Sequence, residues 1–227
     1  MKKLGAIIPV MMFAALAGCG GGGSSTTAAT PTATQVPIEA SVSGFETRSR
    51  TFTSGYTDPL NGDVYALTFT LTPGADAVFE GKAAKTATTV ITIKKNGVVS
   101  ASTSTTEYFT QAPFVLLGTT SGSSYVVTGA QQPLPLTGKV GDSGALYTST
   151  TYTDSSKSSI GSTSSVNFTI EPDSASTVYF CENVVTRFTS LSPNLSTSEC
   201  FRIDTTGTIT GMRFTLGIGG KTVTFTG

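Results

Sequence analysis

The sequence of 227 residues predicts an all-β protein made of antiparallel strands. In the clearest segments, residues 67–72, 166–171 and 212–216, large apolar residues alternate with polar ones, most often threonine. Such alternation is typical of a strand with one buried and one hydrated face. Turn-forming pairs lie between the strand-like segments, and Asn96-Gly97 is the clearest signal for a two-residue hairpin. No segment from residue 36 onward shows a convincing helical stripe, so we expect meanders of strands.

Serine and threonine dominate the composition. About 69 residues, about 30% of the chain, are serine or threonine, while only 12% are charged. This share of small hydroxyl residues is far above ordinary usage. Threonine combines a high β propensity with a hydroxyl that binds water, so threonine-bearing faces stay hydrated with few charges. We therefore expect most of the threonines on the hydrated faces of strands.

A weak internal repeat relates the two halves of the chain at an offset of about 96–101 residues. Three pairs of segments match in order: residues 56–58 with 152–154, 69–73 with 168–172, and 127–129 with 225–227. A chance match within a threonine-rich chain is the alternative. The repeat predicts one β module over residues 36–130 and a second over residues 131–227, each of about five or six strands. The modules could share one barrel or sandwich, and we favour two closely packed modules.

The N-terminus has the pattern of an export signal. Lys2 and Lys3 precede an apolar run over residues 4–17, which is shorter than the roughly 20 residues that a membrane-spanning helix needs. We therefore predict a cleaved signal peptide over residues 1–18. Its last residues and the one that follows, Leu16-Ala17-Gly18-Cys19, resemble the lipobox of bacterial lipoproteins.

The lipobox resemblance implies a lipid anchor at Cys19. Cleavage in that family leaves the cysteine as the first residue, which carries diacylglycerol on its sulfur and an acyl chain such as palmitate on its amino group; several acyl chains together anchor a protein stably. Gly20 stands where an Asp would resemble an inner-membrane retention signal, which favours the outer membrane, on either its periplasmic or its surface face. Residues 19–35 are then the acylated cysteine and a flexible tether. The alternative is an ordinary secretory signal with Cys19 unacylated.

The composition argues against common enzymatic and nucleic-acid-binding functions. The chain has no histidine, so it lacks the commonest general base and metal ligand. Residues 141–144, Gly-Asp-Ser-Gly, resemble the nucleophile loop of chymotrypsin-like serine proteases, but that chemistry needs an imidazole, and Ser143 is predicted to be a turn residue. Basic and acidic side chains number 14 each, which leaves no basic surface for nucleic acid. We expect no catalytic residue, cofactor or metal.

Acidic side chains offer two further candidate sites. Paired carboxylates could hydrolyse glycosides, but the available glutamates are scattered and are expected to be solvated strand-face residues: Glu80, Glu107, Glu171, Glu182 and Glu199. Residues 58–63, Asp-Pro-Leu-Asn-Gly-Asp, are rich in oxygen ligands but lack the spacing of a calcium loop. We expect a turn there.

Cys181 and Cys200 are the candidate disulfide. An oxidising envelope compartment favours the bond. However, a simple hairpin turning at residues 192–194 would pair Cys181 near Asp204 and Cys200 near Thr186, too far apart for a bridge. Either the turn is longer or the strand bulges and the disulfide forms, or both thiols are free.

The function we expect is that of a non-enzymatic, lipid-anchored envelope protein whose β body presents loops or a strand edge to an unknown protein or polymer partner. The pattern resembles small β-rich outer-membrane lipoproteins of Gram-negative bacteria, most of them uncharacterised. It is also distantly similar to lipid-anchored two-barrel surface proteins that bind host factors.

The alternative function is a carrier of a small apolar ligand inside a barrel. A cavity of several hundred Å³ would favour the carrier. Seven phenylalanines could line such a cavity, although core packing is the commoner role of these residues: Phe52, Phe69, Phe79, Phe114, Phe168, Phe180 and Phe214.

Overall fold

The computed structural model describes residues 35–122, 124–189, 195–218 and 221–227. The predicted signal peptide, Cys19 and all of the tether except Gln35 lie outside the described residues. The elements are, in order, α1 (Ile38–Glu46), β1 (Arg50–Thr57), β2 (Val64–Pro73), β3 (Ala77–Phe79), β4 (Lys82–Lys95), β5 (Val98–Gln111), β6 (Phe114–Ser121), β7 (Ser124–Gln131), β8 (Ser143–Tyr152), β9 (Ile160–Pro172), β10 (Thr177–Phe188), β11 (Leu195–Asp204), β12 (Ile209–Ile218) and β13 (Lys221–Thr226).

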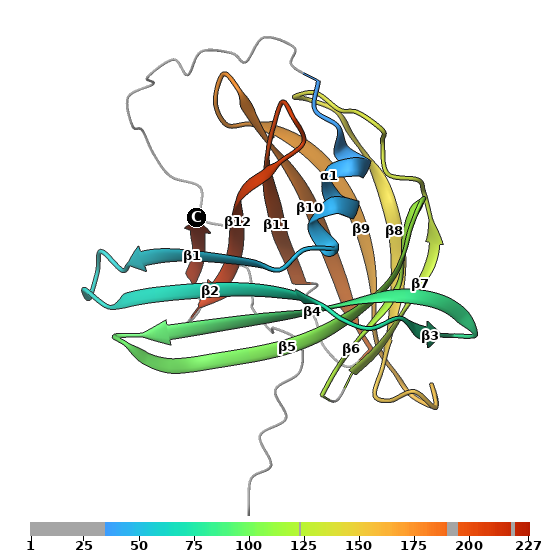
Figure 1. Ribbon diagram of the computed structural model, residues 1–227. Coiled ribbons are helices and arrows are strands. Elements are labelled where there is room, and N and C mark those ends of the chain that lie inside the picture. The colour runs from blue at the N-terminus through green and yellow to red at the C-terminus, as the bar shows by residue number, and fades with distance from the viewer. Residues whose placement is uncertain (1–34, 123, 190–194, 219–220) are drawn as a thin grey trace, which may run out of the picture.

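The strands form a single, nearly closed barrel (Figure 1). Each strand from β4 to β13 pairs antiparallel with the next, β1 pairs with β2 and β2 with β4, and short β3 pairs with β4 outside this path. The two ends of the sheet meet at the rings of Tyr56 on β1 and Phe225 on β13, whose centroids lie 6.4 Å apart. The all-β, antiparallel prediction is confirmed, and of the alternatives left open the structure has the single barrel.

The matched segments of the internal repeat fall on strands of the same rank in each half of the barrel. Tyr56 lies on β1 and Tyr152 on β8, the strands that begin the two halves. Phe69 lies on β2 and Phe168 on β9, the second strand of each half. The end of the first predicted module coincides with the end of β7, and β7 pairs directly with β8 in the same sheet. Both halves therefore contribute to one continuous wall.

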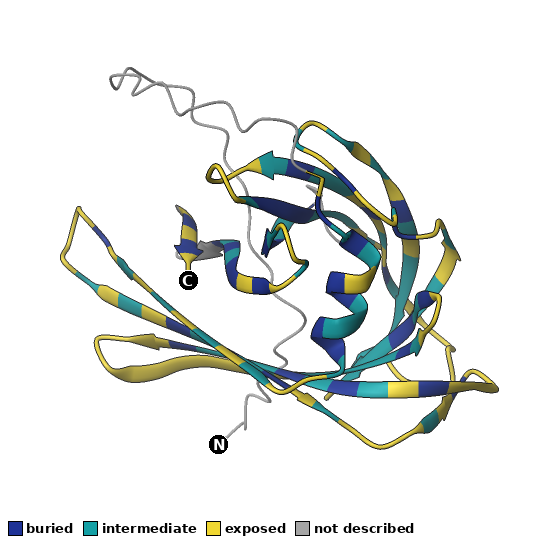
Figure 2. Ribbon diagram, turned by 45° about the horizontal axis from the view of Figure 1, so that its top comes forward, coloured by how far each residue is buried: buried dark blue, intermediate teal, exposed yellow. Residues whose placement is uncertain are grey.

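A helix that the sequence analysis did not predict lies inside the barrel (Figure 2). Helix α1 buries Ile38, Val42 and Phe45, which have the i, i+4, i+7 spacing of one helical face. The stripe was missed because it is only two turns long and is interrupted by serines and a glycine. At its start, the backbone NH of Ile38 donates to the carbonyl of Leu136 at 3.1 Å, which joins the helix to the segment between β7 and β8.

The apolar core fills the half of the barrel that holds α1. Phe45 contacts rings on opposite walls, with centroids 6.0 Å from Phe69 on β2 and 5.1 Å from Phe201 on β11. On β2 the predicted inward positions Leu67, Phe69 and Leu71 are all buried, which confirms the alternation read from the sequence. A barrel of twelve strands is wider than its own wall side chains can fill, and the helix supplies the missing volume at this end.

A smaller apolar cluster lies on the outer face, beneath β3. The ring of Phe79 stacks on Tyr108 and Tyr125, with centroids 4.5 and 5.1 Å apart. Gly118 lies under this ring, because a Cβ at this position would stand 2.6 Å from Phe79. Phe79, one of the predicted cavity-lining residues, is therefore outside the barrel.

The predicted turns at the ends of two neighbouring hairpins are confirmed. Asn96 and Gly97 both have positive φ, 50° and 83°, between β4 and β5, as a type I′ hairpin turn requires. Residues 58–63 form the turn between β1 and β2, where Asp58 accepts a hydrogen bond from the backbone NH of Leu60 at 2.9 Å. Ser143 is the first residue of β8 and not part of the turn before it, so that prediction was wrong by one position.

The two described cysteines form a disulfide between β10 and β11. Cys181 lies directly opposite Cys200, and their Cα atoms are 3.9 Å apart. The pairing predicted for a simple hairpin was wrong, because Thr177 and not Cys181 lies opposite Asp204. The bond is on the outer face of the barrel, since the neighbouring residues Phe180 and Phe201 point into the core.

Candidate functional site

The half of the barrel beyond α1 contains a cavity of about 530 Å³. Residues from β4 to β12 line it, so nearly the whole circumference of the wall contributes. Its lining is mixed. Hydroxyl groups come from inward-facing serines and threonines such as Thr128, Ser149 and Thr197, and apolar contacts come from residues such as Leu116 and Val184.

The hydroxyl lining corrects the expectation that threonine marks the hydrated outer face. On β2 this holds, but on β5 serine and threonine occupy both faces, and Thr103 and Thr105 face the cavity. A strand that is polar on both faces carries no alternation from which its inward side could be read. The structure therefore uses the abundant hydroxyl residues twice, on the outside of the barrel and inside its lumen.

Four glutamates gather where the cavity meets the apolar core, and we call this group the carboxyl floor: Glu46, Glu107, Glu182 and Glu199. Glu182 on β10 and Glu199 on β11 are directly opposite partners, and both line the cavity. Glu107 lies on the inward face of β5, and Glu46 is the last residue of α1. On these three strands the next inward position toward the core is a phenylalanine: Phe109, Phe180 and Phe201.

Burial makes the carboxyl floor hard to ionise. Burial raises the pKa of Glu107 to about 7, and a hydrogen bond from the Thr89 hydroxyl opposes this shift. Burial raises the pKa of Glu182 to about 7 and that of Glu199 to about 8, and charge repulsion among the three carboxyls adds to both. The pKa of Glu46 is also raised by burial and by the same three neighbours. A carboxyl in a poorly solvated site beside other carboxyls favours its neutral form.

No basic side chain compensates the carboxyl floor in the described parts of the chain. The ion pairs found there join surface groups, such as Lys157 with Glu80 at 2.6 Å, and none includes a floor glutamate. Oε2 of Glu46, a residue only 5% exposed, has no hydrogen-bond partner among the described residues. Strongly perturbed, unpaired carboxyls in a cavity are typical of functional sites.

The expectation that all five candidate glutamates are solvated strand-face residues was wrong for three of them. Glu80 and Glu171 do lie outside the lumen, where they pair with Lys157 and Arg213. Glu182 and Glu199 line the cavity, and Glu107 lies on the same face of β5 as the cavity-lining Thr103 and Thr105. Only the strand register, which the sequence did not settle, brings these three residues from distant parts of the chain to one level of the lumen.

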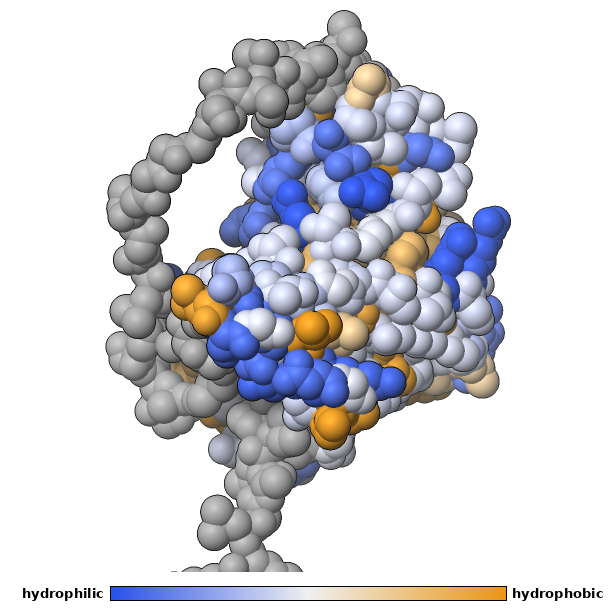
Figure 3. All heavy atoms as spheres, turned by 90° about the vertical axis from the view of Figure 1, so that its left-hand side faces the viewer, coloured by the Kyte–Doolittle hydropathy of each residue, from blue (hydrophilic) through white to orange (hydrophobic). Residues whose placement is uncertain are grey.

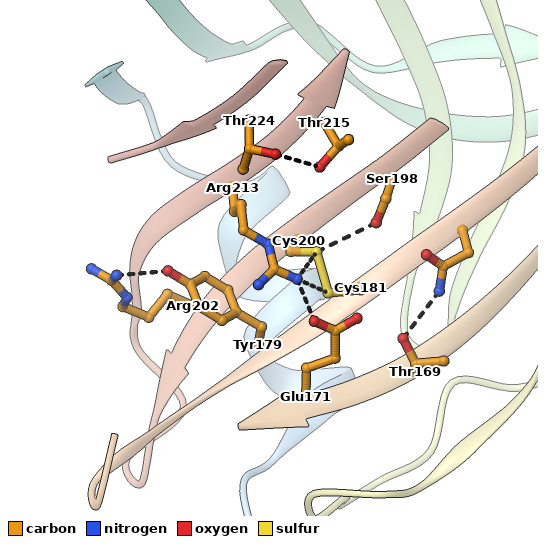
Figure 4. Close-up of polar contacts among 11 residues, drawn as sticks. Thr169, Glu171, Tyr179, Cys181, Ser198, Cys200, Arg202, Arg213, Thr215 and Thr224 are labelled. Atoms are coloured by element: carbon orange, nitrogen blue, oxygen red, sulfur yellow. Dashed lines mark hydrogen bonds and ion pairs between the residues drawn. A yellow bond between two sulfur atoms is a disulfide. The ribbon is translucent and has the colours of Figure 1, made fainter. Parts of the chain in front are cut away.

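A second polar cluster covers the disulfide on the outer face (Figure 4). The Arg213 guanidinium lies 4.5 Å from the centre of the Tyr179 ring and 3.2 Å from Sγ of Cys200, and it pairs with Glu171. Arg202 donates to the Tyr179 hydroxyl at 2.6 Å. Arg202 pairs with Asp173 as Arg213 does with Glu171, so this cluster is a structural cover with its charges balanced.

The seven phenylalanines named as candidate cavity residues have different places. Phe214 lines the cavity. Phe69, Phe114 and Phe180 are buried in the core, Phe52 and Phe168 pack against it, and Phe79 is on the outer face. Core packing is thus the main role of this set.

Comparisons with known proteins found no match: no family model, no curated protein and no solved structure is similar to this chain. Within the described ranges, no helix is long and apolar enough to cross a bilayer. The same ranges contain no group of three or more acidic or cysteine side chains placed to hold a metal ion.

Proposed function

We propose that this protein is a non-enzymatic, lipid-anchored envelope protein that carries a small organic molecule in the lumen of its barrel. The observation that supports the carrier over the displayed scaffold is the cavity of about 530 Å³. Its volume falls within the range of roughly 300–1,000 Å³ that is typical of small-molecule sites. Protein interiors are otherwise close-packed, so a space of this size inside a barrel favours a ligand.

The cavity is lined by both hydroxyl and apolar side chains, which indicates the polarity of its ligand. A purely apolar molecule would leave hydroxyls such as that of Thr128, which has no hydrogen-bond partner among the described residues, without a partner in a poorly hydrated site. A molecule with both polar groups and an apolar body satisfies both parts of the wall. We therefore propose an amphipathic ligand in place of the apolar one expected from the sequence.

Filling the cavity is expected to remove the bound molecule. Ser149 lines the lumen, while its neighbour Thr148 is exposed on the outer face. Ser149→Phe should lower the amount of co-purifying small molecule by at least about tenfold, since the new ring occupies the ligand's volume. Native mass spectrometry of protein purified from its own envelope fraction measures this. Thr148→Phe is the control and should retain the molecule; equal loading of the Ser149→Phe variant would contradict the carrier function.

The lipid anchor is tested separately at Cys19. Replacing Cys19 with serine removes the thiol that would carry the acyl chains, so the protein should move from the detergent phase to the aqueous phase of a cloud-point partition. Ser25→Ala, a change in the predicted tether, should leave the partition unchanged. A Cys19→Ser protein that stays in the detergent phase argues against the anchor.

The displayed scaffold is a second candidate function, which exposed apolar side chains at two hairpin ends support. Figure 3 shows separate apolar groups among polar ones on this side of the barrel. Four apolar side chains are exposed at these hairpin ends: Leu60 and Val64 at the β1–β2 turn, and Val98 and Val99 after the β4–β5 turn. The exposed fraction of Leu60 is 81%. The two hairpin ends are neighbours, because the backbone NH of Asn96 donates to the carbonyl of Val64 at 2.7 Å. Exposed apolar patches often mark interaction surfaces. Under this function, serine at Leu60 and Val98 impairs partner binding, whereas Ser149→Phe does not.

A further inference from the structure

The carboxyl floor points to the charge of the ligand. We propose that the molecule held in the lumen carries a positively charged nitrogen, such as a primary ammonium group, which the floor glutamates bind while the walls above contact the apolar body of the molecule. This inference rests on the proposed carrier function and adds the chemical class of the ligand.

The charge balance within the lumen indicates the sign of the ligand's charge. The groups that face the floor are Glu46 from α1, Glu107 from β5, Tyr147 from β8, Glu182 from β10 and Glu199 from β11, and Thr89 on β4 donates to Glu107. All of these groups are acidic or neutral. Arg50, at the start of β1, forms no ion pair with any of them in the described parts of the chain. When these carboxyls ionise, the site therefore holds negative charge with no basic partner among the described residues.

The charge of the floor limits the kind of ligand that the site can bind. Once ionised, the floor would repel an anion. A neutral molecule would leave its carboxylates, half-buried at Glu107, Glu182 and Glu199, without a counter-charge. A metal ion alone lacks a coordinating set, since no group of three suitable side chains in the described residues is placed to hold one. A metal ion would also leave most of a 530 Å³ cavity unfilled. An organic cation meets both requirements.

Glu46 gives an independent indication that a hydrogen-bond donor binds at the floor. This side chain is only 5% exposed, its Oε2 is without a hydrogen-bond partner in the described structure, and it lies close enough to the other floor carboxyls to be influenced by their charge. A buried carboxyl oxygen without a hydrogen-bond partner at the end of α1 is unfavourable unless a hydrogen-bond donor occupies the lumen. An ammonium group carries three donors and no acceptor, which suits the floor once its carboxyls have ionised and only accept hydrogen bonds.

The inferred cation also sets a pH dependence. The pKa values of Glu107 and Glu182 are about 7 and that of Glu199 is about 8, so the floor is largely protonated in mild acid and ionises as the pH rises. A primary ammonium remains charged over this range. Its affinity should therefore increase from mild acid to mild alkali, with release of protons from the floor on binding.

The test compares hexylammonium with 1-hexanol, which share a carbon chain and differ in charge. Isothermal titration of the full-length protein should show hexylammonium binding at least about tenfold more tightly than 1-hexanol near pH 8. Near pH 5.5 this preference should largely disappear, because the floor is protonated. Titration in buffers of different ionisation enthalpy should show proton release with hexylammonium and none with 1-hexanol.

Variants of the floor glutamates test whether these residues cause the preference for hexylammonium. The double change Glu182→Gln and Glu199→Gln should remove most of the preference for hexylammonium near pH 8 and leave 1-hexanol binding unchanged. Glu80→Gln, on the outer face, is the matched control and should bind both as the wild type does. Equal binding of the two probes by the wild type overturns the inference about charge and leaves the carrier function standing. Binding of neither probe at concentrations on the order of millimolar overturns both proposals.

Discussion

Phe45→Ala is expected to lower the free energy of unfolding by about 3–5 kcal/mol, the usual cost of truncating a large buried aromatic residue. Phe45 is only 2% exposed and contacts rings on both sides of the lumen, with Phe69 on β2 and Phe201 on β11. The cost should lie near the upper part of this range, because the strands are held apart by their closed arrangement and cannot collapse into the space left behind.

Chemical denaturation followed by fluorescence or circular dichroism measures this change. Ala40→Ser, at an exposed position of the same helix, is the control and should alter stability by no more than about 0.5 kcal/mol. A loss of less than about 1 kcal/mol for Phe45→Ala would mean that the helix does not support the barrel wall.

The strands were predictable where one face is apolar and the other polar. Leu67, Phe69 and Leu71 alternate with threonines, and the structure buries all three. Asn96-Gly97 fixed a hairpin because few other pairs adopt two successive positive φ angles. The helix was not predictable by the same means, since Ser41, Ser43 and Gly44 are poor helix formers and the segment is helical through its tertiary contacts.

The candidate site was not predictable, because it depends on how the sheet closes. Strand number and tilt decide whether a barrel interior is filled or hollow, and neither follows from local sequence. Glu107 lies on β5, which has hydroxyl residues on both faces. The sequence of this strand therefore does not alternate between polar and apolar residues, and the inward orientation of Glu107 cannot be predicted from it. Glu182 and Glu199 become neighbours through the same register that joins Cys181 to Cys200. A simple hairpin turning at residues 192–194 predicts a different register, so the sequence does not bring these residues together.

The stability of the protein is expected to fall as the pH rises from about 5 to about 9. Burial raises the pKa of Glu107 and Glu182 to about 7 and that of Glu199 to about 8, from an ordinary value of 4.5. The folded state therefore holds protons that the unfolded state has already released. The stabilisation from these groups is complete below the ordinary value and is lost as the pH passes through the raised values. Each glutamate should contribute on the order of 2–3 kcal/mol to this loss, after allowance for water in the cavity.

Denaturation curves recorded across this pH range test the prediction, and Glu199→Gln provides the contrast. Glutamine keeps the shape and hydrogen-bonding capacity of the protonated acid but cannot ionise, so the variant should match the wild type near pH 5 and exceed its stability near pH 9. Glu171→Gln, where the carboxylate pairs with Arg213 on the outer face, should show no such gain.

Because an ammonium ligand would stabilise the ionised floor, adding hexylammonium should restore much of the stability lost by the wild type near pH 9 and little of it in Glu199→Gln. A wild-type stability that is flat or rises between pH 5 and 9 would show that the floor carboxyls ionise freely in the lumen, and the predicted rise in cation affinity between pH 5.5 and 8 would then lose its basis.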